Sequence, residues 1–328
     1  MMEPCVLVTG GAGYIGSHTC KALAQAGFRP LTVDDLSTGH ADAVRWGPFE
    51  AGDIGDAGFM DAVLNRYHPV AALHFAGSSI VEDSIVDPLR YYHNNVGKTL
   101  VLLDRLQAHG VRNIVFASSA AVYGARQPFP TGTADPQPPL SPYGYSKMTV
   151  ERVLQDMRAQ GLVNAVSLRY FNVCGADPDG DIGEDHVPET HLIPNVVTLA
   201  RTGGRLAVYG TDYPTADGTC VRDYIHVTDL AHAQVEVLRR LPAKNLAPSL
   251  DLGHGRGASI LDVIAAMSGS RGISLDWYDA GRRRGDPAVL VAEAEILPRL
   301  LGYTPRFSDM ATILDTTWKW QTARMTQP

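Results

Sequence analysis

Short apolar runs alternate with amphipathic segments through the first half of the chain, as in a parallel sheet covered by helices. The segment Gly16–Gly27 has helical spacing, with Ala22, Leu23 and Ala26 on one face. Strands are expected at Cys5–Thr9, Leu31–Asp34, Val70–Phe75, Asn113–Ala117 and Ala165–Arg169, and further helices near Leu100–His109 and Tyr143–Gln160. We therefore predict an α/β fold built on a doubly wound parallel sheet.

This alternation ends after Asn172. Segments rich in Pro, Gly and Asp, namely Ala176–Pro188 and Gly210–Gly218, interrupt it, and no second glycine-rich strand–loop–helix unit follows. We expect residues 1–172 to form the sheet domain, to which the C-terminal half returns. Residues 173–328 are expected to form mainly a smaller mixed α/β region that binds the substrate.

Composition and charge exclude several classes of partner. The 328 residues are 45% hydrophobic and 19% charged, with a formal net charge of -7, which argues against nucleic acid or an anionic membrane as a partner. The cysteines Cys5, Cys20, Cys174 and Cys220 are scattered without metal-ligand spacing, so no metal site is predicted. Because neither a signal-peptide pattern nor a membrane-length apolar run is present, we expect a cytoplasmic protein.

A glycine-rich loop joins the first strand to the first helix and indicates a Rossmann-type dinucleotide site. Gly10 permits a tight turn, Gly13 lets the backbone approach a pyrophosphate, and Gly16 permits close helix–strand packing. Asp34 ends the second strand, where a carboxylate binds the adenine ribose and repels a 2′-phosphate, so NAD is favoured over NADP. Residues at two further strand ends are also expected to contact the cofactor: Asp53, Ile54, Phe75, Ala76 and Gly77.

A second motif, Ser141–Lys147, begins a helix and supplies candidate acid–base groups. Tyr143 and Lys147 are spaced i, i+4 and therefore project from one helix face. We expect the Lys147 ammonium to lower the pKa of Tyr143, which would make the phenolate a usable general base. Ser119, at the end of a strand, is expected to share hydrogen bonds to the reacting hydroxyl.

Several segments resemble the UDP-glucose 4-epimerase family of the extended short-chain dehydrogenase/reductase superfamily. They are Val8–His18, His74–Gly77, Tyr91–Val96, Ser119–Gly124, Ser141–Lys147, Arg169–Asn172 and Asp217–Val227. The resemblance implies an isomerase that inverts C4 of a UDP-sugar, interconverting UDP-galactose and UDP-glucose. It implies a 4-keto intermediate, transient hydride transfer to tightly bound NAD, and a homodimer formed through a helix bundle.

The resemblance also assigns roles by position. Tyr143 becomes the acid–base group, and Lys147 and Ser119 support it between cofactor and substrate. Further NAD contacts are implied at Tyr14, Ile15, Asp34, Asp53, Ile54, Phe75, Ala76, Asn94 and Phe171. Sugar-nucleotide contacts are implied at Asn172, His191, Leu192, Ala207, Val208, Tyr209, Arg222, Arg283, Asp286 and Leu290. Guanidinium groups suit diphosphate oxygens, which agrees with the two arginines in this set.

Other enzymes that act on nucleotide sugars differ from a 4-epimerase at particular residues. Sugar dehydratases resemble the chain but carry an Asp-Glu pair where it has Ala120-Ala121, which cannot transfer protons. His191 occupies a position that is asparagine in some relatives, and Leu290 one that limits the room beside the sugar C2 substituent. UDP-pentose and UDP-N-acetylhexosamine substrates remain open, and an NAD-sensing regulator without turnover is the alternative from another class.

The dimer has one further support in the sequence. Two helices carry apolar residues on more than one face, which indicates either a subunit interface or deeper burial within one chain. These residues are Leu100, Leu103, Leu106, Val150, Val153 and Leu154.

Overall fold

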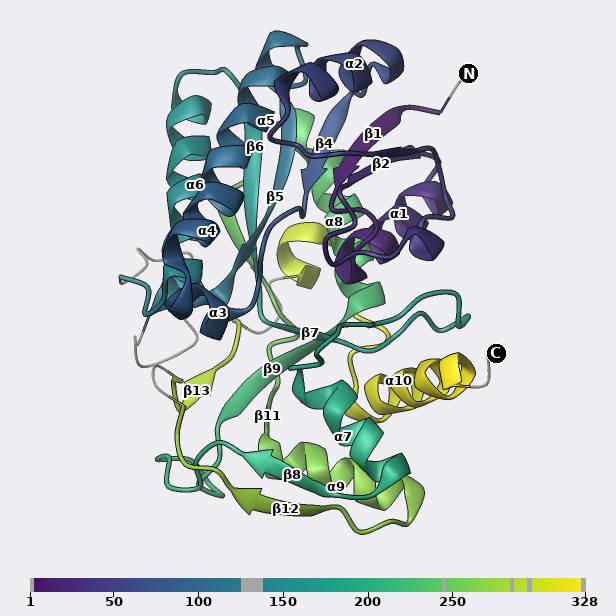
Figure 1. Cartoon of the computed structure of the whole chain (residues 1–328), viewed down its shortest axis with the longest axis vertical. Coiled ribbons are helices and arrows are strands. Elements are labelled where there is room, and N and C mark those ends of the chain that lie inside the picture. The colour runs from purple at the N-terminus through teal and green to yellow at the C-terminus, as the bar shows by residue number, and fades with distance from the viewer. Residues whose placement is uncertain (1–2, 125–137, 244–245, 284–285, 294–296, 326–328) are drawn as a thin grey trace. The chain divides into compact units, whose positions relative to one another are not determined.

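The computed structural model describes residues 3–124, 138–243, 246–283, 286–293 and 297–325, which divide into two compact units (Figure 1). The described residues of 3–124, 138–170 and 231–251 belong to the first unit, and those of 171–230 and 252–325 belong to the second. The chain thus leaves the first unit after residue 170 and contributes to it again from residue 231.

A seven-stranded sheet forms the centre of the first unit. In spatial order its strands are β10 (Ser249–Leu252), β6 (Asn164–Tyr170), β5 (Asn113–Ser119), β4 (Ala71–His74), β1 (Cys5–Thr9), β2 (Arg29–Asp34) and β3 (Phe49–Ala51). Neighbours from β6 to β3 are all parallel. The predicted doubly wound parallel sheet is therefore confirmed.

Helices cover both faces of this sheet, as the strand order requires. They are α1 (Tyr14–Gln25), α2 (Ala57–Tyr67), α3 (Val81–Val86), α4 (Pro88–Tyr92), α5 (Lys98–Ala108), α6 (Pro142–Ala159) and α8 (Val227–Arg240). The order advances one way from β1 to β3 and the other way from β4 to β6, so right-handed crossovers place the two sets of helices on opposite faces. Apolar residues of α2, α5 and α6 form one core with Leu7, while α1 and α8 are joined by a hydrogen bond from Thr19 to Gln234.

The apolar residues that suggested a second surface are mostly internal, which corrects that interpretation. Four of them lie in the core of the first unit, with relative exposures of 4%, 0%, 1% and 2%: Leu103, Leu106, Val150 and Leu154. They are buried because both helices pack directly on the sheet. Of the six, Leu100 is 45% exposed, and α3 and α4 add further exposed apolar side chains at Ile85, Val86 and Leu89. Across the described ranges no helix has the length and apolar character needed to cross a membrane.

The second unit is a smaller mixed α/β assembly. Strand β9 (Val221–His226) pairs with β7 (Asn172–Cys174), β11 (Gly257–Ser259) and β13 (Val289–Leu290), and β8 (Arg205–Val208) pairs with β12 (Asp276–Asp279). Its helices are α7 (Leu192–Thr202), α9 (Ile260–Arg271) and α10 (Met310–Met325). Apolar residues from all three helices form one core with β8 and β9.

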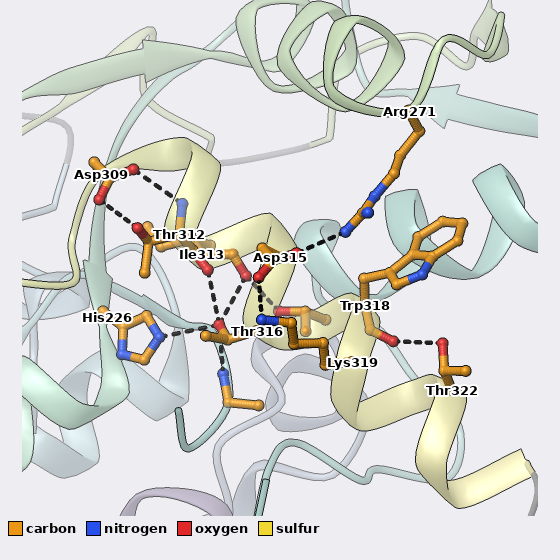
Figure 2. A network of polar contacts seen from close by, with 12 residues as sticks. His226, Arg271, Asp309, Thr312, Ile313, Asp315, Thr316, Trp318, Lys319 and Thr322 are labelled. Atoms are coloured by element: carbon orange, nitrogen blue, oxygen red, sulfur yellow. Dashed lines mark hydrogen bonds and ion pairs between the residues drawn. The ribbon is translucent and has the colours of Figure 1, made fainter. Parts of the chain in front are cut away.

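Helix α10 is attached to this core by polar contacts along its length (Figure 2). Asp315 forms an ion pair with Arg271 of α9 at 2.9 Å, and the same guanidinium lies 4.6 Å from the ring centroid of Trp318. The next residue after Asp315, Thr316, has its hydroxyl 3.1 Å from Nε2 of His226, at the end of β9. These contacts fix α10 against both α9 and the central strand.

Candidate active site

The glycine loop follows β1 and begins α1, as the sequence indicates. Gly10 has a φ of +73°, and a Cβ there would lie 2.6 Å from the Ala76 nitrogen. A Cβ on Gly16 would lie 2.1 Å from the Gly10 carbonyl oxygen, so neither position accepts a side chain. Gly13 is the N-cap of α1 and offers no side chain to cap it. The loop therefore leaves the positive end of the α1 dipole open to an anionic group.

Asp34 connects this loop to β2. Its carboxylate accepts hydrogen bonds from the backbone N–H groups of Ala12, at 3.0 Å, and Leu36, at 2.9 Å. Burial raises the pKa of Asp34, and the two backbone hydrogen bonds lower it. Each carboxylate oxygen retains a second acceptor site, so the group can still bind ribose hydroxyls.

Asp53 makes different contacts, which the sequence did not indicate. Its carboxylate forms an ion pair with Lys98 at 2.8 Å and accepts a hydrogen bond from the Gly55 N–H at 2.8 Å. Burial tends to raise the pKa of Asp53, but these contacts lower it overall. Ile54, which follows it, is buried in the core of the first unit. Both residues therefore have structural partners of their own.

The remaining residues expected to bind the cofactor lie near the switch point between β1 and β4. The exception is Phe171. Backbone N–H groups of Phe75 and Ala76 both donate to the Thr9 carbonyl, at 2.9 and 3.1 Å. Asn94 donates to the Ser78 hydroxyl at 3.0 Å. Tyr14 and Ile15 begin α1, Gly77 follows Ala76, and Phe171 belongs to the second unit, where it is buried.

These features fit the parts of a dinucleotide. The uncapped α1 N-terminus suits a pyrophosphate, Asp34 suits a ribose diol, and the strand ends of β1 and β4 mark the topological switch point at which such sheets bind ligands. The residues present therefore fit NAD.

Tyr143, Ser119 and Lys147 lie together in the first unit. Ser119 lies close enough to Tyr143 to lower the pKa of its phenol, and the Ser119 hydroxyl accepts a hydrogen bond from the Ala121 N–H at 3.2 Å. Lys147 Nζ lies 5.9 Å from the Tyr143 ring centroid and donates to the Ala117 carbonyl at 2.9 Å. Ser141 caps α6 through a 3.2 Å hydrogen bond from the Gly144 N–H, which fixes the first turn that carries Tyr143.

The pKa of Tyr143 differs from the expectation. Burial raises it, and the hydrogen bond with Ser119 lowers it by a smaller amount. Lys147 is itself buried, which lowers its pKa to about 8. Without cofactor or substrate, desolvation of Tyr143 therefore outweighs the expected effect of the ammonium, and the phenol stays protonated.

Two buried networks around this helix were not identified from the sequence. Asn95 accepts a hydrogen bond from the Ser78 N–H at 2.8 Å and donates to Ser146 of α6 at 3.1 Å. Arg169 forms an ion pair with Glu151 of α6 at 2.7 Å, and both side chains are 2% exposed. Asn95 stands next to Asn94 in the segment that carried the resemblance, so its position was a signal. No signal in the sequence indicated that Arg169 pairs with Glu151.

In the second unit, five of the residues expected to contact the sugar nucleotide form a cluster. Asp286 bridges Arg222, at 3.5 Å, and Arg283, at 3.3 Å. The Arg283 guanidinium lies 4.4 Å from the ring centroid of Tyr209. Leu290 of β13 is the register partner of Arg222 in β9. Two guanidinium groups and one carboxylate give the cluster a net positive charge, which suits a diphosphate.

The other predicted contacts in this unit occupy separate elements. Ala207 and Val208 end β8, next to Tyr209. Asn172 begins β7, where it is the register partner of Tyr224. His191 and Leu192 are the N-cap and the first residue of α7.

Residues 6–247 match the NAD dependent epimerase/dehydratase family. The chain belongs to this family. A UDP-glucose 4-epimerase from Rhizobium leguminosarum bv. trifolii is 45% identical over 98% of this chain and 98% of its own length. The resemblance drawn from the sequence motifs is thereby confirmed.

Solved structures of epimerases agree with this assignment. The crystal structure of a UDP-glucose 4-epimerase from Brucella ovis in complex with NAD has a TM-score of 0.91 and 45% identity, covering 96% of this chain and 97% of that one. The UDP-Glc/GlcNAc 4-epimerase from Campylobacter jejuni has a TM-score of 0.84 and 35% identity, covering 98% of this chain and 99% of that one. The similarity to these epimerases thus extends over both units.

Proposed function

We propose that the chain is an NAD-dependent UDP-sugar 4-epimerase that interconverts UDP-galactose and UDP-glucose. The observation that carries this proposal is the grouping of Tyr143, Ser119 and Lys147, with Lys147 Nζ 5.9 Å from the Tyr143 ring centroid, in a fold that also has an open glycine loop. Near full-length similarity to UDP-glucose 4-epimerases supports the substrate class. Residues 1–172 are assigned mainly to cofactor binding and residues 173–328 mainly to the sugar nucleotide.

The chain's own residues would move one proton at sugar O4. NAD held by the glycine loop and Asp34 would supply hydride transfer at C4, and its positive charge would favour the phenolate form of Tyr143. Tyr143 Oη removes the O4 proton and gives it back after the 4-keto sugar has presented its other face. The Ala121 N–H occupies only an acceptor site of Ser119, so the Ser119 O–H can still donate to the same oxygen. Lys147 stabilises the phenolate electrostatically.

The arginine cluster of the second unit would hold the remote half of the substrate. Arg222 and Arg283 present charged donors to the diphosphate, while the sugar must remain free to turn. Tight binding of the nucleotide and loose binding of the sugar let the same proton-transfer group act on both epimers. In this assignment Asp286 orients the two guanidinium groups before substrate binds.

The enzyme is further assigned to the cytoplasm and to a homodimer. The exposed apolar residues of α3 and α4, together with Leu100 of α5, supply a surface for self-association. Sedimentation velocity of wild type and of a Val86→Lys variant tests this, because a charge at an apolar dimer interface should yield monomers. A monomeric wild type would contradict it.

Product analysis with UDP-galactose and no added reductant tests the function. UDP-glucose should appear without net accumulation of NADH, because the hydride returns to the sugar. Tyr143→Phe should retain NAD and lose about 10²–10⁴ in rate, since it removes the proton-transfer group. Tyr145→Phe, two residues along the same helix at a 37% exposed position, is the matched control and should be fully active. Equal activity of the Tyr143→Phe variant would contradict the assigned role.

A further inference from the structure

The loop that leads into α7 gathers four metal-ligating side chains within the second unit. They follow the pattern Glu-x-His-x-x-Glu-x-His: Glu184, His186, Glu189 and His191. One ligating atom from each lies within 4.8 Å of all the others. The sequence predicted no metal site because only cysteine spacing was considered, whereas this loop offers imidazole and carboxylate groups.

The contacts of Glu184 are unusual for a simple ion pair. Its side chain is 3% exposed, and its Oε1 lies 2.6 Å from Nδ1 of His191 and 3.2 Å from Nδ1 of His186. Among the described residues, Glu184 Oε1 has no partner that satisfies the distance and angle of a hydrogen bond. The oxygen is therefore close to two imidazole nitrogens and still able to bind a third partner. The buried carboxylate is therefore directed into the cluster.

Glu189 completes the set. Its Oε1 lies 3.4 Å from Nδ1 of His191, and its Oε2 lies 3.9 Å from Nδ1 of His186. The backbone N–H groups of Thr190 and His191 both donate to Oε1, each at 2.7 Å, which fixes the carboxylate. Such outer hydrogen bonds are the usual means of orienting a metal ligand.

We propose that Glu184, His186, Glu189 and His191 bind one divalent transition-metal ion of the zinc class. Tetrahedral zinc with bonds of about 2.0–2.1 Å places neighbouring ligand atoms about 3.3 Å apart. The nitrogen–oxygen distances between these histidines and carboxylates run from 2.6 to 3.9 Å, a range that includes this value. Two imidazoles favour zinc-like ions over magnesium or calcium, which prefer oxygen ligands.

The position of the cluster gives the ion a structural role. His191 is the N-cap of α7, yet its side chain makes no capping hydrogen bond. On the other side of the loop, the Trp320 indole of α10 donates to the Glu184 carbonyl at 3.1 Å, and Arg324 pairs with Asp185. An ion with four protein ligands would therefore fix the loop to the start of α7.

A proton is the competing occupant. Burial alone would lower the pKa of His191, but the carboxylates of Glu184 and Glu189 raise it to about 10. Because metal ligation needs neutral histidine, binding of the ion must release protons.

Titration of the chelator-treated full-length protein with Co²⁺ tests the proposal, because tetrahedral Co²⁺ has intense visible bands. We expect one equivalent to bind per chain and Zn²⁺ to displace it. His186→Ala and Glu184→Gln should each weaken binding by at least about 10–100-fold, the cost of losing even an outer partner of a ligand. Asp179→Asn, in the separate acidic group of Asp177, Asp179 and Asp181, is the matched control and should bind as wild type does.

Thermal unfolding provides a second measurement that does not depend on activity. Zn²⁺ should raise the unfolding temperature of wild type and of Asp179→Asn, but not that of Glu184→Gln or His186→Ala. His186 is 32% exposed, so its replacement should leave the fold intact, and circular dichroism checks this. Two results would overturn the proposal. They are a folded wild type that binds neither ion, and equal weakening by Asp179→Asn and His186→Ala.

Discussion

Replacing Glu151 by leucine would leave the Arg169 guanidinium buried without a counter-charge. The two side chains share two hydrogen bonds, from Arg169 Nε to Oε1 at 3.0 Å and from Nη2 to Oε2 at 2.7 Å. Ser118 donates to the same carboxylate at 2.5 Å, and Arg169 Nη1 donates to the Tyr123 hydroxyl at 2.8 Å. Burial alone would lower the pKa of Arg169, and Glu151 raises it. A guanidinium group remains protonated in proteins, so the arginine stays charged after the substitution.

The expected loss of stability follows from these contacts. Two hydrogen bonds between charged groups contribute about 1.5–3 kcal/mol each. Leucine fills a volume similar to that of glutamate, so the cost reflects lost charge pairing more than a cavity. We therefore expect Glu151→Leu to reduce the free energy of unfolding by about 3–5 kcal/mol, the usual cost of leaving one buried charge unpaired.

Urea denaturation of wild type, Glu151→Leu, Arg169→Met and the double variant measures this coupling. The double variant should be more stable than Glu151→Leu, because replacing both charges by apolar groups removes the unpaired ion. Arg152→Ala is the control on the same helix, since it breaks a pair with Asp156 whose side chains are 74% and 63% exposed. Its cost should stay within about 0.5 kcal/mol. Additive single-variant losses, or a loss below about 1 kcal/mol for Glu151→Leu, would refute this reasoning.

Three further predictions concern the cofactor loop, pH and substrate range. Gly16→Ala should abolish NAD retention, because the new Cβ would lie 2.1 Å from the Gly10 carbonyl oxygen. The control is Gly269→Ala, inside α9 with open space around it, which should stabilise the protein by about 0.5–1 kcal/mol. Equal NAD retention in both variants, measured by release on denaturation, would exclude this role of Gly16. Burial, followed by the charge of Lys147, lowers the pKa of His74 to about 3, so the stability that depends on its neutral form is present above pH 6.5 and is lost as pH falls towards 3. The loss should reach about 1.4 kcal/mol per pH unit, and a His74→Gln variant with the same slope in urea denaturation between pH 6.5 and 4 would contradict it. Leu290→Tyr should suppress activity on UDP-N-acetylhexosamines and spare UDP-galactose, and equal loss on both substrates would exclude a role in selectivity.

Much of the first unit could be predicted because its signals are local. Strand β1 lies exactly where the apolar run places it, α6 begins within one residue of its expected start, and Tyr143 and Lys147 share a face because helical spacing requires it. The glycine positions of the loop are similarly local, since backbone conformation and close approach restrict them to residues without a side chain.

The pKa of Tyr143 and the burial of helix residues depend on parts of the chain that are far apart in sequence, and no sequence pattern predicted them. The spacing of Tyr143 and Lys147 predicted an activated phenol, but burial raises the pKa of Tyr143, and the Ala117 carbonyl accepts a hydrogen bond from the lysine. Leu103 and Val150 were assigned in part to an outer surface, yet the sheet covers them.

The sequence by itself determined the parallel sheet, the dinucleotide loop and the spacing of the Tyr–Lys pair, because each follows from periodicity or local backbone geometry. Only the tertiary structure decided that Arg169 meets Glu151, that Asp286 bridges two arginines, and that burial sets the protonation of Tyr143. The partner of a buried side chain, and the extent to which water is excluded from it, depend on which distant segments pack around it. Those segments come together only when the chain folds.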